Sequence, residues 1–376
     1  MTALDERPGA GNTGNTGDAG DVPVVTDLRV EHLTVPLRRP WGPDVTVVHV
    51  LVTRVEVSDG STGTGFSWTP TIGASAVEAM LTHDVRDVAL GRPATTGWWD
   101  LAWEHLHEAG GGGITTIALA GLDLALWDLA AGRAGRSLTD LLGRRHDSQP
   151  TYGSGVNLHY SDAELADQVR RWVDAGHSGV KVKVGRPDLA EDLRRVALVR
   201  DLLGPDRALM VDANQRWDLP RASAAVQALA EFDPAWVEEP LRADDTSGLV
   251  ELRRRTDVRL AVGENVHTWY RFRDLIEAGA ADVLQPNVVR VGGITPFLRI
   301  ADLVRGAGLE LAPHLLPELS GQLALALPGR TWVEDVEDAG FAELGVLRTP
   351  TGGSCADGSF RGGARTGLGF DFRTAT

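Results

Sequence analysis

GVKVKVG (residues 179–185) is one of eight short apolar runs that decide the fold of this 376-residue chain. The other runs, in chain order, are TYGSGV (151–156), ALMVDAN (208–214), AWVEEP (235–240), LAVGEN (260–265), DVLQPN (282–287), LELAPH (309–314) and TWVEDV (331–336). Seven of the eight precede helix-like sequence, and the last helix is expected to be short. Eight strand–helix units at a spacing of about 20–30 residues predict a (β/α)8 barrel of the α/β class. A six-stranded doubly wound sheet is the alternative, and the count of eight favours the barrel.

The residues before these runs predict a separate α+β unit. VTDLRVEHLTVPL (25–37) and VTVVHVLVTRVEVSDG (45–60) alternate apolar and polar residues, as half-buried strands do. Helical patterns follow at 74–90, 98–108 and 115–131, and the last is apolar on most faces, which predicts burial between layers.

These patterns divide the chain into three parts and a tail. We expect a flexible leader (1–21), an α+β domain (22–145) and the barrel (146–344). The Gly-rich tail (345–376) is expected to pack back on the α+β domain. The leader carries acidic residues and lacks an apolar core segment, so it does not read as a signal peptide.

Composition excludes several classes of protein. Lys+Arg total 37 against 52 Asp+Glu, a net charge of −15 that argues against a nucleic-acid partner. The single Cys, Cys355, excludes a disulfide framework and a multi-Cys metal site. No run approaches the ~18 apolar residues of a membrane span. We therefore expect a soluble cytoplasmic protein without a membrane partner.

The cations are almost all Arg. Only two Lys occur, Lys181 and Lys183, and both lie on the second barrel run with the same strand parity. Two cations on one face repel and lower each other's pKa, which would make one of them a usable base. Arg stays protonated in proteins and cannot take that role. The alternative is a pair of barrel-lining cations that neutralise nearby carboxylates.

Polar residues gather where the predicted strands end, which is the face that carries barrel active sites. Asp212, Glu238 and Glu264 end adjacent strands at intervals of 26 residues. Three carboxylates without Cys or His suit a hard divalent cation, and one Mg²⁺ ion is the prediction. The alternative is that they cap helices or pair with Arg. Glu239 should face away from this group and form a structural salt bridge.

Two more polar residues complete the predicted ring. His314 ends the strand across the barrel from the lysines, and we expect it to be catalytic, although a lone His is more often structural. Glu334 would donate a hydrogen bond to a substrate oxygen if protonated, or pair with Arg otherwise. Together these groups suit abstraction of a proton α to a carboxylate, with a metal stabilising the enediolate.

The ordered motifs resemble the enolase superfamily, and within it the mandelate racemase group. The resemblance rests on KVK (181–183), VDANQ (211–215), WVEEP (236–240), GEN (263–265), QPN…GGIT (285–295), PHL (313–315), Glu334 and GLDLALWDL (121–129). It implies an N-terminal capping domain, a modified barrel and Mg²⁺ on Asp212, Glu238 and Glu264. It further implies a homo-oligomer acting on a small carboxylate.

The resemblance also assigns roles to single residues. It implies Lys183 and His314 as the acid/base pair, Lys181 touching the substrate carboxylate, and Glu334 polarising it. The loops that hold Arg38, Trp41 and Trp68 would select the distal part of the substrate, and Asn214 would also contact it. These loops are ordinary solvated turns in the alternative interpretation.

One position departs from the family pattern. Asn287 stands where the mandelate racemase group has an Asp beside the His, and where the lysine-pair groups have a Lys. Asn287 can orient His314 but cannot stabilise its imidazolium, so the pKa of His314 should be lower. We therefore expect a dehydratase that converts an acid sugar to a 2-keto-3-deoxy acid, with Arg38, Arg39 and Asp44 suiting a polyhydroxylated substrate. The alternatives are a racemase or epimerase on the same scaffold and a catalytically inert metal-binding barrel.

Overall fold

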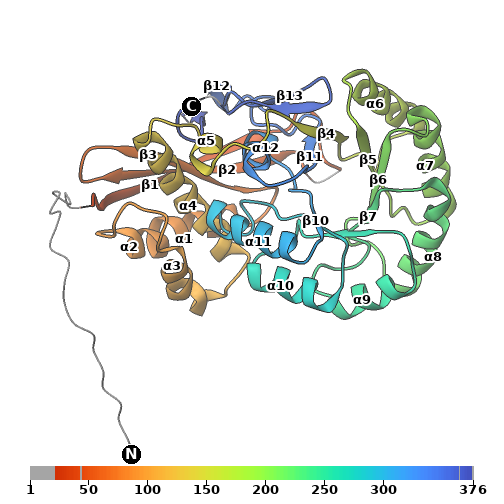
Figure 1. The fold of residues 1–376 in the computed structure, drawn as a ribbon, viewed down its shortest axis with the longest axis horizontal. Coiled ribbons are helices and arrows are strands. Elements are labelled where there is room, and N and C mark those ends of the chain that lie inside the picture. The colour runs from red at the N-terminus through yellow and green to blue at the C-terminus, as the bar shows by residue number, and fades with distance from the viewer. Residues whose placement is uncertain (1–21, 43–44, 364, 375–376) are drawn as a thin grey trace, which may run out of the picture.

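The computed structural model describes residues 22–42, 45–363 and 365–374. The predicted leader (1–21) and Asp44 lie outside these residues. Figure 1 shows two parts side by side, an N-terminal domain of strands and helices and a barrel ringed by helices.

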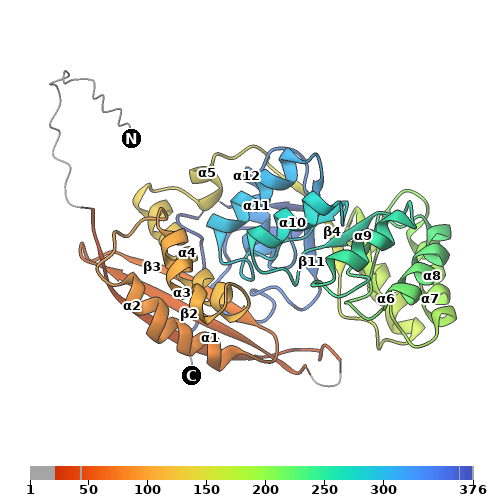
Figure 2. The same ribbon diagram turned by 90° about the horizontal axis from the view of Figure 1, so that it is seen from below.

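The N-terminal domain is built on an antiparallel meander. Strand β1 (Val25–Pro36) pairs with β2 (Val47–Val57), and β2 pairs with β3 (Thr62–Thr69). Helices lie along one face of this sheet (Figure 2). In chain order they are α1 (Ala74–Met80), the π-helix η1 (Leu81–Val85), α2 (Arg86–Ala89), α3 (Trp99–Leu106), the 3₁₀ turn η2 (His107–Ala109) and α4 (Ile114–Arg133). The short helix α5 (Leu138–Leu142) follows and packs against helix α12 (Pro317–Ala326) of the barrel. The helix predicted over 74–90 is thus interrupted by a π-helical turn.

Two glycines bring α4 against the sheet. A Cβ atom at Gly65 would lie 2.1 Å from the carbonyl oxygen of Gly121, and one at Gly63 would lie 2.2 Å from that of Ala125. Only glycine permits so close an approach of helix to strand. Among the described residues, α4 is the one helix long and apolar enough to cross a membrane, but 78% of its apolar window is buried inside the protein. Its composition is therefore that of a core helix.

The barrel predicted from the eight runs is confirmed. Its parallel strands are β4 (Gln149–Ser154), β5 (Gly179–Lys183), β6 (Ala208–Asp212), β7 (Trp236–Glu238), β8 (Leu260–Val262), β9 (Val283–Leu284), β10 (Glu310–Leu311) and β11 (Val333–Val336). The helices between them are α6 (Asp162–Asp174), α7 (Leu189–Leu203), α8 (Leu219–Leu229) with the 3₁₀ turn η3 (Ala230–Phe232), α9 (Thr246–Arg254), α10 (Trp269–Ala278), α11 (Ile294–Gly306) and α12 (Pro317–Ala326). Strands β4 to β10 pair in chain order, and β11 returns to pair with β4.

The eighth strand is followed by the tail and not by a helix. The tail holds β12 (Leu347–Thr349), β13 (Ser354–Ala356), β14 (Ser359–Arg361) and β15 (Asp371–Phe372). The rings of Phe370 and Phe372 lie 4.9 and 5.5 Å from that of Phe66 on β3. The backbone N–H of Leu368 donates to Asp128 of α4 at 2.8 Å. These contacts set the end of the chain against the N-terminal domain.

The strand register places the polar side chains in one layer. Lys183 lies opposite Asp212, and Asp212 lies opposite Glu238. Below this layer the lumen is filled by buried side chains that include Tyr152, Met210 and Trp236. Because these side chains fill the lower lumen, polar groups can gather only at the carboxyl ends of the strands.

Candidate active site

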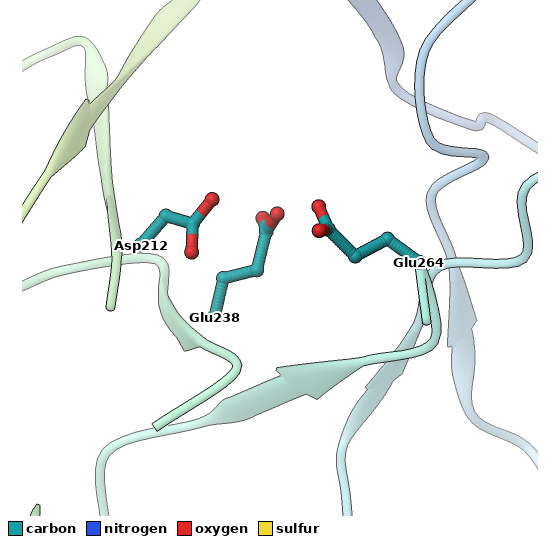
Figure 3. Close-up of side chains that lie close together, drawn as sticks. All are labelled: Asp212, Glu238 and Glu264. Atoms are coloured by element: carbon teal, nitrogen blue, oxygen red, sulfur yellow. The ribbon is translucent and has the colours of Figure 1, made fainter. Parts of the chain in front are cut away.

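Three buried carboxylates meet at the carboxyl end of the barrel. Asp212 and Glu238 end β6 and β7, and Glu264 follows β8 by two residues. Each offers an oxygen atom within 4.8 Å of the other two, and the three carboxyl groups face one another across the lumen (Figure 3). Parallel strands end at the same face of a barrel, so residues 26 apart in sequence become neighbours.

The donor set fits a divalent cation with a preference for oxygen. All three ligand candidates are carboxylates, which suit Mg²⁺. Burial, aided by neighbouring carboxylates, raises the pKa of Glu238 to about 7, although Lys181 opposes the shift. A cation held among the three groups would relieve this cost of gathering negative charge away from water.

Neighbouring side chains hold two of the carboxylates in place. The amide of Gln285 donates to Glu238 Oε2 at 2.6 Å, and Trp236 Nε1 donates to the same oxygen at 3.2 Å. The backbone N–H of Asn214 donates to Asp212 Oδ1 at 2.8 Å. Such contacts orient metal-binding groups. The sequence showed Gln285 as a polar strand end but did not reveal this role.

Lys181 and Lys183 are paired with carboxylates, contrary to the expectation that their mutual repulsion dominates. Lys181 Nζ lies 2.6 Å from Glu238 Oε1 and 2.8 Å from Glu334 Oε1, and only 1% of its side chain is exposed. Lys183 contacts Asp212 and borders the cavity. Burial acts to lower the pKa of each lysine, but the carboxylates outweigh it and raise both. The prediction of a lowered pKa is therefore wrong for this arrangement.

His314 lies at the opposite end of the carboxylate row from Lys183. Its Nε2 is 2.9 Å from Glu264 Oε2 and its Nδ1 is 3.1 Å from Asn287 Nδ2. Burial acts to lower the pKa of His314, but Glu264 and Glu334 outweigh it and raise the pKa. The expectation of a lower pKa, drawn from Asn287 alone, is wrong because the Nε2 side faces carboxylates.

Asn287 fixes which nitrogen of His314 carries hydrogen. Its Oδ1 accepts from the backbone N–H groups of Val289 and Arg290, each at 3.1 Å. The amide NH₂ of Asn287 therefore faces His314, and His314 Nδ1 must accept a hydrogen bond from it. The neutral ring therefore carries its hydrogen on Nε2, which points toward the carboxylate row.

Glu334 and Glu239 do not form the interactions predicted for them from the sequence. Burial acts to raise the pKa of Glu334, but Lys181 and His314 lower it to about 2, so Glu334 is ionised and bound to Lys181 instead of being protonated or paired with Arg. Glu239 accepts from Asn265 at 2.8 and 3.0 Å, and no described cation pairs with it. Burial and the charge of Glu264 raise the pKa of Glu239 to about 9.

The rim of the site also carries backbone strain. Asn214, Gln215, Glu239, Leu315 and Leu316 have φ between 39° and 61°, a region that residues other than glycine seldom occupy. They follow β6, β7 and β10, the strands that end at the carboxylate row and His314. Non-glycine residues persist in this region when surrounding structure over-determines them, which is common at functional sites.

A cavity of about 250 Å³ lies between the N-terminal domain and the barrel. Lys183, Glu264, His314 and Glu334 border it, and so do Asn214, Trp41 and Trp68; Lys181 and Arg38 do not. Arg38 instead lies 3.8 Å from Asp338, on the loop after β11. Arg290 borders the cavity but was not singled out from the sequence, where nothing separates it from the other arginines.

Comparison with known families agrees with this geometry. Residues 26–143 match the model described as mandelate racemase / muconate lactonizing enzyme, N-terminal domain, and residues 164–376 match the enolase C-terminal domain-like model. The chain belongs to the mandelate racemase and muconate lactonizing enzyme family of the enolase superfamily.

Several relatives of this family member are acid-sugar enzymes. This chain is 38% identical to the 3,6-anhydro-alpha-L-galactonate cycloisomerase of Streptomyces coelicolor, over 76% of this chain and 80% of the relative. It is 36% identical to the L-talarate/galactarate dehydratase of Salmonella typhimurium, over 78% and 74% of the two chains.

Solved structures of similar proteins contain magnesium. A racemase from Streptomyces coelicolor with bound magnesium superposes with a TM-score of 0.86 at 33% identity, covering 93% of this chain and 97% of that one. The L-talarate dehydratase of Polaromonas sp., complexed with Mg and L-glucarate, has a TM-score of 0.85 at 36% identity, covering 93% and 95%. Mg²⁺ is thus the cofactor of this family member, and its three carboxylates suit that ion.

Proposed function

We propose that the protein is a Mg²⁺-dependent acid-sugar dehydratase that removes the proton α to a carboxylate and expels the β-hydroxyl. The observation that carries the proposal is the placement of Lys183 and His314 at opposite ends of the carboxylate row, both on the wall of one cavity. A substrate in that cavity has a candidate base on one side and a hydrogen-bond donor on the other.

The proposed steps use residues of this chain. Asp212, Glu238 and Glu264 would hold Mg²⁺, which would supply positive charge opposite the substrate carboxylate and stabilise negative charge that develops on it. Lys183 is the candidate base; Asp212 raises its pKa, and a cation held by Asp212 would weaken that effect. Lys183 Nζ takes the α-proton, the protonated ring of His314, favoured by Glu264 and Glu334, gives its Nε2 proton to the departing β-hydroxyl and becomes neutral, and water leaves. The resulting enol becomes a 2-keto-3-deoxy acid.

The remaining site residues support this centre. Lys181 anchors Glu238 and Glu334, and Asn287 holds His314 in the Nε2–H form. We propose Asn214, Trp41 and Trp68 as substrate contacts because they border the cavity. Arg38 does not border the cavity, and we propose that it ties its loop to Asp338. Reaction in the cytoplasm and assembly as a homo-oligomer remain part of the proposal.

A cycloisomerase is the second candidate, favoured by the similarity to the enzyme of Streptomyces coelicolor. It would use the same α-proton abstraction, but the bond that breaks would join the β-carbon to a ring oxygen. His314 would protonate the released alkoxide, and the product would be an isomer of the substrate. A racemase or epimerase is less well supported, because His314 in the Nε2–H form cannot accept a proton on the nitrogen that faces the cavity.

A panel of sugar acids tests the proposal. The enzyme is incubated with Mg²⁺ in D₂O, and ¹H NMR follows loss of the α-proton signal while a carbonyl reagent detects 2-keto products. We expect keto-acid formation from at least one acid and none after chelation of the metal. Exchange of the α-proton with inversion and without elimination would establish a racemase instead, and no exchange on any acid would support an inert barrel.

A further inference from the structure

Arg290 differs from the other basic side chains on the cavity wall in what it contacts. Lys183 contacts Asp212, and His314 Nε2 lies 2.9 Å from Glu264 Oε2. The half-buried Arg290 also borders the cavity, but no carboxylate among the described residues pairs with its guanidinium. Its hydrogen bonds go to neutral oxygens instead, so its partners are chosen for their position and not for their charge.

The arginines of the loop after β1 have ordinary carboxylate partners. Arg38 lies 3.8 Å from Asp338, and Arg39 lies 2.8 Å from Glu164. Neither arginine borders the cavity, so no contact supports the expectation that they suit a polyhydroxylated substrate. Arg290 is therefore the arginine on the described cavity wall whose role the proposed function leaves open.

Asn265 connects Arg290 to two acidic residues. Its Oδ1 accepts from Arg290 Nη1, which also donates to the backbone carbonyl oxygen of Glu264 at 3.2 Å. Its Nδ2 donates to Glu264 Oε1 at 2.9 Å and to the two carboxylate oxygens of Glu239 at 2.8 and 3.0 Å. A charged donor on the amide oxygen polarises the amide and strengthens the bonds that its NH₂ donates.

The Asn265 amide determines how Glu264 faces the site. Because Asn265 holds Oε1, Oε2 is the oxygen that lies beside His314. Glu264 is also one of the three carboxylates that suit Mg²⁺. Hydrogen bonds to a metal-binding carboxylate fix its orientation and tune the affinity for the ion.

The backbone of Arg290 acts on the second asparagine of the site. Its N–H donates to Asn287 Oδ1 at 3.1 Å, beside the equivalent bond from Val289. These bonds turn the Asn287 amide NH₂ toward His314. One residue thus fixes two side-chain amides, one next to a metal-binding carboxylate and the other next to the histidine.

We propose that Arg290 is a positioning residue for the metal site, whose guanidinium holds Asn265, and through it Glu264, in the orientation that binds Mg²⁺. The proposal goes beyond the proposed function, because metal binding is measured without turnover of any acid. The competing role is a direct hydrogen bond from the guanidinium to an oxygen of the substrate, since Arg290 borders the cavity.

Calorimetric titration of chelator-treated protein with MgCl₂ tests the proposal. Arg290→Met removes the donor and keeps most of the side-chain length. We expect its Kd for Mg²⁺ to rise about 10–100-fold, the range typical of partners that orient metal ligands. Arg290→Lys keeps a charged donor and should bind Mg²⁺ more tightly than Arg290→Met. Arg305→Met is the matched control, because Arg305 is exposed on α11 and pairs with Asp302, and its Kd should equal that of wild type.

A double-mutant cycle shows whether Arg290 acts through Asn265. Asn265→Ala alone should weaken Mg²⁺ binding by a similar factor. Adding Arg290→Met to Asn265→Ala should then change the Kd by less than about twofold, because the connecting amide is already absent. Two independent roles would instead multiply their factors in the double variant, and that result would overturn the proposal.

The remaining outcomes separate the two roles of the guanidinium. An unchanged Kd for Mg²⁺ in Arg290→Met would overturn the proposal, and a raised KM for the acid in that variant would show direct substrate binding. Circular dichroism in chelator checks folding, and if Arg290→Met does not fold, the cycle is repeated with Arg290→Gln, which also removes the charge. Failure of the proposed function is seen separately, as absence of α-proton exchange by wild type, and it leaves the comparison of Kd values intact.

Discussion

At the scale of single residues, Asn287 decides what His314 can do. The Asn287 carbonyl is taken by two backbone N–H groups, so the amide cannot rotate to offer an oxygen to the ring without losing both bonds. His314 is therefore held as a donor toward the cavity. A donor can assist departure of a hydroxyl, but it cannot remove a proton from the opposite face of the substrate, as a two-base racemase requires.

Replacing Lys183 tests the base directly. Lys183→Arg keeps a cation beside Asp212 but cannot release a proton near neutral pH. We expect α-proton exchange to fall by about 10²–10⁴-fold, the range typical of general-base catalysis. Lys183→Ala should lose as much activity. Thermal unfolding serves as the control for folding, and a Lys183→Arg enzyme with near wild-type exchange would show that another group is the base.

Asn287→Asp tests the constraint on His314. One Asp oxygen can keep accepting from Val289 and Arg290, while the other accepts from Nδ1–H and stabilises the imidazolium. Nε2 then becomes able to take up and return a proton. We expect α-proton exchange in the epimer that wild type does not process to rise at least about tenfold, equivalent to about 1.4 kcal/mol. Unchanged exchange in that epimer would mean that the ring state is set elsewhere, and Asn287→Ala is the control for loss of contact alone.

At the scale of secondary-structure elements, the N-terminal domain reaches into the loop that carries Asn287. Asp123 of α4 accepts from the backbone N–H of Thr295 at 3.0 Å and from its hydroxyl, at the start of α11. Trp99 Nε1 donates to the carbonyl oxygen of Gly292 at 2.9 Å. A side chain from one domain thus caps a helix of the other, close to the segment that orients His314.

Asp123 should make stability depend on pH. Burial raises the pKa of Asp123 from its ordinary 3.8 to about 7, although hydrogen bonds from Thr295 oppose the shift. The folded state thus holds a proton that the unfolded state releases, so this contribution is full below about pH 4 and is lost as pH rises through 7.

Asp123→Asn removes this titration. The free energy of unfolding of wild type relative to the variant should therefore fall between pH 4 and pH 8, by up to roughly 4 kcal/mol. Urea unfolding across that range measures the difference in the free energy of unfolding. The contributions of the other titratable groups cancel in this difference because both proteins contain them. Two curves that remain parallel would contradict the assignment.

The elements themselves could be predicted from sequence, whereas several contacts of the site could not. Short apolar runs such as GVKVKVG have the length and composition of buried parallel strands, and the register then follows from the barrel. The carboxylates of Asp212, Glu238 and Glu264 were predictable because they repeat with the strands. The pairing of Lys181 with Glu334 was not, since it joins residues far apart in sequence and depends on side-chain direction.

At the scale of the whole molecule, the site lies where two domains meet, and its carboxylates outnumber its cations. Asp212, Glu238, Glu264 and Glu334 are offset within the barrel by Lys181 and Lys183 and by His314 when it is protonated. Burial makes each uncompensated charge costly. Binding of a divalent cation should therefore stabilise the folded chain as well as activate it.

Metal removal tests both effects together. With Mg²⁺ at about 100 times its Kd, linkage predicts a gain of about 2.7 kcal/mol, or a rise of a few degrees in Tm, relative to protein in chelator. Chelation should also abolish α-proton exchange. Glu264→Gln, which keeps the shape of the side chain, is the control and should lose most of the Mg²⁺-dependent rise in Tm. An equal rise in that variant would place the ion elsewhere.

The two lysines of β5 also make the folded chain a poor target for amine chemistry and for proteases that cut after lysine. The chain contains no other lysine, and the side chains of Lys181 and Lys183 are only 1% and 11% exposed. A Lys-specific endoprotease can therefore cut the folded protein only when strand β5 leaves the barrel. The rate of cleavage into two large fragments therefore measures how often the barrel opens. Binding of Mg²⁺ and substrate to the site should slow this cleavage.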